Sequence, residues 1–148
     1  MPKNSLLLKV LYVEMRVDEK GAARVLEEST NSYLNIFCAF TVVTNSFIAL
    51  EFTESTLFDI IFIKKDMETL NAVNFLHILR NIGSPTDIVL LVESDDQISE
   101  AEAREQGFAG ILRKDYQASQ LCEIITNLVS TPAMSHLEEL TSASKCAK

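Results

Sequence analysis

Charged side chains stand directly after several apolar runs of this 148-residue chain, where they could meet and do chemistry. Glu14 follows the first run, Lys64 and Asp66 follow the third, and Lys114 follows the last. A carboxylate can hold a hard cation such as Mg²⁺, and an aspartate can also act as a nucleophile in group transfer. A lysine can neutralise an anion or pair with a carboxylate. The elements that position these residues therefore decide what they can do.

Strand and helix patterns alternate along the chain. Apolar, β-branched runs predict strands at Leu6–Val13, Ile36–Val43, Phe58–Ile63, Asp87–Val92 and Ala109–Arg113. Helical spacing predicts helices at Asp18–Ser29, around Phe47–Leu50, at Val73–Leu79, between the last two strands, and around Leu121–Leu128. We expect the fourth helix to open with a capping box of Ser94 and Gln97 and to end at Gly107.

This alternation predicts an α/β fold with a single, doubly wound parallel sheet and helices on both faces. Function in such sheets gathers at the carboxyl ends of the strands, which carry Glu14, Lys64 and Lys114 here. We assign residues 1–130 to one domain. Residues 131–148 shift to Ser, Thr, Ala and charge, and we interpret them as a flexible C-terminal tail or linker.

Composition excludes several classes of function. A net charge of −8 without a basic cluster argues against nucleic-acid binding. Apolar runs are far shorter than the roughly 20 residues that cross a membrane. Cys38, Cys122 and Cys146 form no CxxC pair, which favours reduced thiols and a cytoplasmic or other intracellular location. His77 and His136 lack partners at metal-ligand spacing, and phosphate-binding glycine patterns are absent, so we expect no metal and no cofactor.

The strand ends and their neighbours resemble one known family. Residues 6 to about 129 resemble the receiver domain of two-component response regulators. The segments that carry the resemblance are LKVLYVEM, TNSFIALEF, FDIIFIKKDM, NFLHILR, DIVLLVESD and GFAGILRKD. It implies a flavodoxin-like strand order, 2-1-3-4-5.

The resemblance also implies a phosphorylation site that this chain has largely lost. Active receivers place two acidic residues after the first strand and a phosphate-accepting aspartate at the end of the third. Glu14 fills the first acidic place, but Met15 fills the second and offers no oxygen to Mg²⁺. Lys64 stands where the acceptor is expected, and an ammonium group can neither accept the phosphoryl group nor hold a metal.

Further departures follow on the last two strands. Val92 replaces the hydroxyl residue that receivers carry at the end of the fourth strand, and Ile111 replaces a frequent aromatic residue. Lys114 remains as expected. Asp115 stands where a proline commonly follows, so the cis peptide bond of that loop is not expected.

We therefore interpret the chain as a degenerate receiver, or pseudo-receiver. It would be a non-catalytic module of a phosphorelay or sensory protein, acting by protein contacts without phosphorylation. We expect an ion pair of Lys64 and Glu14 to replace the metal, with Asp66 near it. The alternatives are a divergent receiver phosphorylated at Asp66, a small-anion site between Lys64 and Lys114, and a flavodoxin-like cofactor-binding protein.

An acidic stretch predicts where partners bind. The helix after the fourth strand, the fifth strand and the last helix form a face through which receivers commonly bind partners. We assign the candidate interaction surface to Asp95, Asp96, Glu100, Glu102 and Ile111. The expected partners are proteins, either a histidine kinase, another signalling domain or a second copy of the chain, and neither nucleic acid nor membrane.

Overall fold

The computed structural model describes residues 7–15, 19–32 and 37–129. Its elements in chain order are β1 (Leu7–Val13), α1 (Glu19–Asn31), β2 (Phe37–Val43), α2 (Ser46–Ser55), β3 (Ile60–Lys64), α3 (Ala72–Asn81), β4 (Asp87–Val92), α4 (Glu100–Gln106) and β5 (Gly110–Arg113). A further helix covers residues 118–129 and is called the C-terminal helix below. The tail predicted at 131–148 lies outside the described residues.

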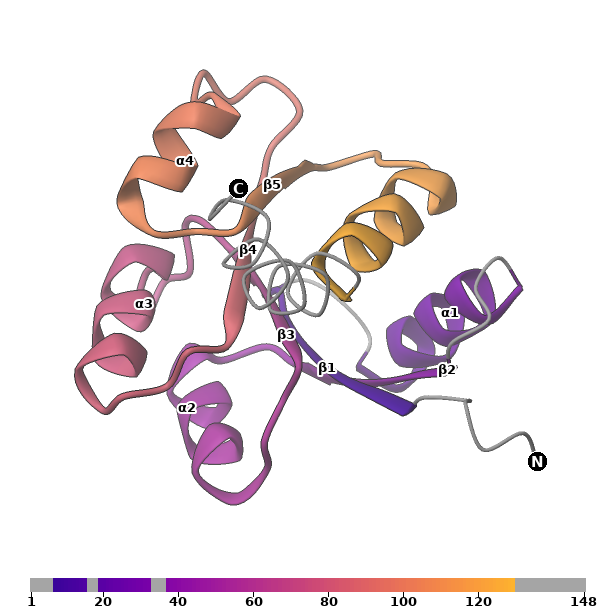
Figure 1. The fold of residues 1–148 in the computed structure, drawn as a ribbon, viewed down its shortest axis with the longest axis horizontal. Helices are drawn as coiled ribbons and strands as arrows, with labels where there is room; N and C mark the ends of the chain where they lie inside the picture. The colour runs from indigo at the N-terminus through magenta and orange to yellow at the C-terminus, as the bar shows by residue number, and fades with distance from the viewer. Residues whose placement is uncertain (1–6, 16–18, 33–36, 130–148) are drawn as a thin grey trace, which may run out of the picture.

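The strands form one parallel sheet in the order β2-β1-β3-β4-β5. Figure 1 shows α2, α3 and α4 on one face of this sheet, and α1 with the C-terminal helix on the other. The predicted doubly wound fold and its strand order are therefore confirmed. Because every strand runs in the same direction, all the carboxyl ends lie at one edge.

Burial on both faces explains why β3 is an unbroken apolar run. Ile61 and Ile63 pack into the core beneath α2, α3 and α4, whereas Ile60 and Phe62 pack into the core beneath α1 and the C-terminal helix. All are at most 1% exposed. Alternate side chains of a strand point to opposite faces, so a strand between two cores needs apolar residues throughout. Lys64 is the first charged side chain of β3.

The cysteines of the described residues behave as the sequence predicted. Cys38 and Cys122 are free and buried. Burial raises the pKa of both thiols, which keeps them protonated and unreactive near neutral pH.

The start of α4 differs from the prediction. The capping box is formed by Ser99 and Glu102, whose side chains each accept the other's backbone N–H, and not by Ser94 and Gln97. Both pairs fit the capping-box rule. Residues 94–98 lie outside the helix, and Asp96 among them is bound by Lys65 and Arg113. Gly107 ends α4 in the left-handed conformation (φ 113°), as expected.

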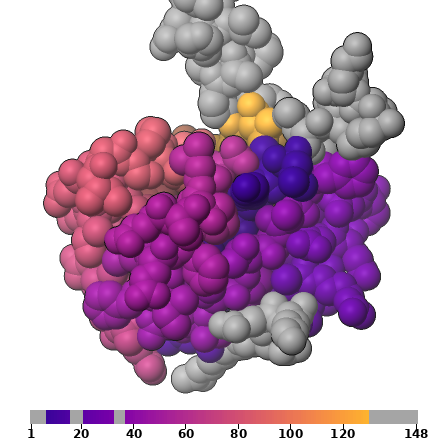
Figure 2. Space-filling view, turned by 90° about the horizontal axis from the view of Figure 1, so that it is seen from below, coloured from indigo at the N-terminus to yellow at the C-terminus, as the bar shows by residue number. Residues whose placement is uncertain are grey.

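Apolar side chains are unusually exposed along α2. Phe47, Ile48 and Phe52 are 52%, 45% and 37% exposed, and Leu57, just beyond the helix, is 81% exposed. Figure 2 views the molecule from below, with the α2 segment at the front.

Candidate functional site

The charged residue at the end of β3 forms an ion pair across the sheet edge. The Lys64 ammonium binds the Glu93 carboxylate, which follows β4, and the Lys64 side chain is only 13% exposed. The predicted pairing of Lys64 with Glu14 is therefore wrong. Glu14 instead accepts the backbone N–H of Met15 at 3.0 Å. Because β3 and β4 are adjacent strands, Glu93 is the carboxylate that β4 delivers beside Lys64.

Glu93 also faces the lysine at the end of β5. Its Oε1 lies 3.9 Å from the Nζ of Lys114, while its Oε2 contacts Lys64. The hydrogen bond to Glu93 is the main cause that raises the pKa of Lys64; burial opposes this shift, and the nearby charge of Glu14 adds to it. Lys64 therefore carries its full positive charge at neutral pH.

A second set of contacts fixes the segment between β4 and α4, residues 93–99, which we call the β4–α4 loop. Lys65 donates to both carboxylate oxygens of Asp96, at 3.0 and 3.2 Å. Arg113 donates to the backbone carbonyls of Asp96 and Ile98, at 2.8 and 2.6 Å. Lys65, directly after β3, and Arg113, the last residue of β5, thus both bind the loop.

A small hollow of about 30 Å³ lies beside the ion pair. It is lined by Tyr12, Glu14, Lys64, Leu91, Val92, Glu93, Leu112, Lys114 and Tyr116. The hydroxyls of Tyr12 and Tyr116 hydrogen-bond at 2.9 Å, and burial is the main cause that raises the pKa of both phenols. The hollow is therefore nearly filled by the protein's own groups.

Of the predicted pocket residues, Glu14, Lys64, Val92 and Lys114 line this hollow, whereas Met15 and Asp66 do not. Val92 is buried, and its carbonyl accepts the backbone N–H of Lys114 at 2.7 Å. Asp66 is exposed and does not line the hollow beside Lys64. Asp115 adopts a left-handed backbone (φ 70°), which aspartate tolerates, and the described residues contain no cis peptide bond.

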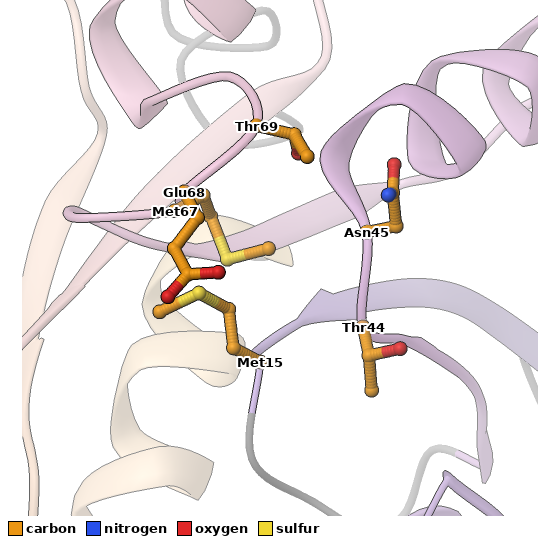
Figure 3. Close-up of a pocket in the computed structure, with 6 residues that line it drawn as sticks. All are labelled: Met15, Thr44, Asn45, Met67, Glu68 and Thr69. Carbon is orange, nitrogen blue, oxygen red and sulfur yellow. The ribbon is translucent and has the colours of Figure 1, made fainter.

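Met15 belongs to a different hollow. This one measures about 260 Å³ and is lined by Met15, Thr44, Asn45, Met67, Glu68 and Thr69. In Figure 3 the side chains of Met15, Met67 and Glu68 point toward a common space. The Thr69 hydroxyl forms a hydrogen bond with the Ser46 hydroxyl at 2.9 Å. The position that the resemblance assigns to a second acid therefore faces thioether and polar groups rather than Lys64.

The candidate interaction surface divides into structural and exposed residues. Asp96 is held by Lys65, and Glu102 closes the capping box, so both stabilise local structure. Glu100 pairs with Arg104 on the surface of α4 at 2.8 Å, and Asp95 is exposed. Ile111 is half-buried and lines a shallow hollow of about 70 Å³ with Glu100, Arg104, Ala109, Gly110, Ile124, Asn127 and Leu128.

The described residues contain neither a cluster of metal ligands nor a helix that could span a membrane. Within residues 7–15, 19–32 and 37–129, no three His, Cys, Asp or Glu side chains gather as metal ligands would. In the same ranges, none of the helices has the length and apolar character needed to span a bilayer. At this edge, the Glu93 carboxylate lies between the ammonium groups of Lys64 and Lys114.

Several residues of the site were missed from the sequence. Glu93, Lys65 and Arg113 were not assigned to it, although all three stand at predicted strand ends. The signal was present: Lys64 ends β3 and Lys65 follows it directly, and three carboxylates follow β4 within ESDD. Which lysine pairs with which carboxylate is seen only in the structure, where β3 and β4 lie side by side.

The comparisons with known proteins bear on the fold. No protein-family model matches the sequence, and no curated protein matches it either. The receiver domain of a Francisella response regulator is similar in structure, with a TM-score of 0.68 and 23% identity over 84% of this chain and 98% of that domain.

Two further solved structures give the same result. The signal receiver domain of a Luxo repressor protein from Vibrio parahaemolyticus has a TM-score of 0.73 and 16% identity, covering 90% of this chain and 98% of its own. The receiver domain of Ssk1 from Saccharomyces cerevisiae, crystallised with the phosphotransfer protein Ypd1, has a TM-score of 0.68 and 18% identity, covering 85% and 91%. The chain thus has the fold of response-regulator receiver domains.

Proposed function

We propose that this chain is a non-catalytic signalling module of the receiver type that acts through protein contacts without aspartyl phosphorylation. One observation carries the proposal: the end of β3, where the resemblance implies an acceptor aspartate, holds Lys64 in an ion pair with Glu93. An ammonium group already neutralised by a carboxylate has no phosphoryl chemistry to perform.

The placement of the neighbouring residues supports this proposal. Asp66 is exposed, and Met15 lines the separate hollow with Met67. Mg²⁺ held for phosphoryl transfer needs converging oxygen donors, and Lys64 occupies the centre of the edge where they would meet. Repulsion between Lys64 and a divalent cation would further weaken metal binding there.

Phosphoryl analogues test the proposal directly. On addition of beryllofluoride or acetyl phosphate with Mg²⁺, we expect no saturable change in the amide NMR signals of Glu14, Lys64 and Lys114. Asp66→Asn is the matched control, because it removes the only alternative acceptor that the sequence suggested. Saturable, Mg²⁺-dependent shifts that disappear in Asp66→Asn would show a working phosphorylation site and contradict the proposal.

The surface that meets partners is, in this proposal, formed by α4, β5 and the C-terminal helix. Its shallow hollow exposes parts of Ile111, Ile124 and Leu128 beside charged Glu100 and Arg104, a mixture suited to protein contacts. Proteins such as a histidine kinase or another signalling domain are proposed partners. We also propose an intracellular location, which the free thiols of Cys38 and Cys122 support.

A second copy of the chain is the partner that can be tested first. In sedimentation velocity, we expect concentration-dependent dimerisation that Asn127→Arg weakens, because a long charged side chain would intrude on the hollow. Glu123→Arg is the control: it lies one helical turn earlier, is exposed and does not line the hollow. Equal dimerisation by both variants would place the dimer contact elsewhere, and a strictly monomeric wild type would exclude the homodimer.

A further inference from the structure

A single carboxylate at the sheet edge contacts two ammonium groups from different strands. Glu93 follows β4, the strand between β3 and β5. Its Oε2 binds Lys64 at the end of β3, and its Oε1 lies 3.9 Å from Lys114 beyond β5. Glu93 therefore uses its two oxygens as a free oxyanion would use them between two cations.

Burial and charge show that this arrangement depends on the carboxylate. The Lys64 side chain is 13% exposed, so most of it is shielded from water, whereas the Glu93 side chain is 40% exposed. A largely buried lysine side chain without a counter-ion is costly, because the lost hydration of its ammonium group is not replaced. Lys114 adds a second positive charge, and it remains 59% exposed. Without Glu93, the ammonium groups of Lys64 and Lys114 would lose the carboxylate that lies between them, and their charges would repel each other.

The β4–α4 loop holds Glu93 where it is. Asp96, three residues later, is bound by Lys65, and Arg113 binds the carbonyls of Asp96 and Ile98. A carboxylate tethered in this way competes with dissolved anions at a high effective concentration. Dissolved phosphate would have to displace a group that cannot diffuse away.

We infer that Lys64 and Lys114 form an oxyanion site whose resident ligand is the Glu93 carboxylate, and that phosphate-class anions enter it once this carboxylate is removed. The inference rests on the proposed function, since it requires that no phosphoryl group is transferred there. Glu93 then neutralises Lys64 and Lys114 permanently, whereas an added anion would do so only while it is bound. The β4–α4 loop therefore keeps one position without phosphorylation.

The experiment is a titration of the full chain with inorganic phosphate at constant ionic strength and neutral pH, followed by NMR of the lysine side chains. Glu93→Ala opens the site, and Glu93→Gln provides a second variant that keeps the side-chain volume. Glu68→Gln is the matched control, because it removes one negative charge at the same edge but lines the other hollow. The double variant Glu93→Ala/Lys64→Met removes one of the two proposed anion ligands.

We expect saturable phosphate shifts at Lys64 and Lys114 in Glu93→Ala, with a dissociation constant at least about tenfold lower than in wild type or Glu68→Gln, because the resident group keeps the free site sparsely populated. The double variant is expected to lose the binding. Equal phosphate binding by wild type and Glu93→Ala, or no binding by either Glu93 variant, would overturn the inference. Neither result involves Mg²⁺ or Asp66, so it is distinct from a failure of the proposed function.

Discussion

Replacing Phe75 with alanine is expected to lower the free energy of unfolding by about 3–5 kcal/mol, the largest effect we expect from a single substitution. Phe75 lies on α3 and is fully buried in the core between the sheet and α2, α3 and α4. The lost ring removes apolar burial and leaves a cavity that packed neighbours fill only in part. Urea denaturation followed by circular dichroism measures the change.

A second phenylalanine separates this packing effect from a general effect of losing an aromatic ring. Phe47 on α2 is 52% exposed, so Phe47→Ala is expected to change the free energy of unfolding by less than about 1 kcal/mol. If Phe75→Ala does not fold, Phe75→Leu keeps most of the volume and is expected to cost about 1–2 kcal/mol. Equal effects at Phe47 and Phe75 would contradict the placement of α3 on the sheet.

Replacing Asp96 with alanine is expected to lower the free energy of unfolding by about 1–3 kcal/mol. Its carboxylate accepts the backbone N–H of Ile98 at 2.8 Å and pairs with Lys65 at 3.0 Å, and the side chain is only 14% exposed. Asp95 is the matched control: it carries the same charge one residue earlier but is exposed, so Asp95→Ala is expected to cost at most about 0.5 kcal/mol.

Acid pH is expected to reduce the difference in the free energy of unfolding between wild type and Asp96→Ala. The hydrogen bond from Ile98 is the main cause that lowers the pKa of Asp96, and Lys65 adds to it. A lowered pKa means that the stabilisation is fully present above the unfolded-state pKa of about 3.9 and is lost as the pH falls through the lower folded-state pKa. Urea denaturation of wild type and Asp96→Ala at neutral and acid pH should show the gap narrowing. A gap that persists at low pH would mean that Asp96 stabilises the loop by another route.

These contacts connect the sheet edge to the proposed interaction face. The β4–α4 loop carries Glu93 and Asp96 and leads directly into α4, whose capping box begins at Ser99. Lys64, Lys65 and Arg113 therefore bind the segment that leads into α4. In the proposed function, the position of this segment is constant, and the module presents one surface to its partners rather than switching between two.

The apolar pattern of the sequence was sufficient to predict the architecture. Continuous runs such as Ile60–Ile63 require burial on both faces, and their alternation with helical patterns leads to a parallel sheet. The resemblance supplied the strand order, which the sheet confirms. The identities of Met15, Lys64 and Val92, which carry the argument against phosphorylation, were likewise readable residue by residue.

The pairing of charges was decided only by the tertiary structure. Sequence placed Glu14 and Lys64 at strand ends, but Lys64 binds Glu93, and Met15 faces another hollow. It also placed the capping box at Ser94, whereas Ser99 opens the helix. Apolar periodicity is a local property that each segment carries by itself. An ion pair or a cap depends on a few ångströms between residues on different strands, and the packed sheet alone sets that distance.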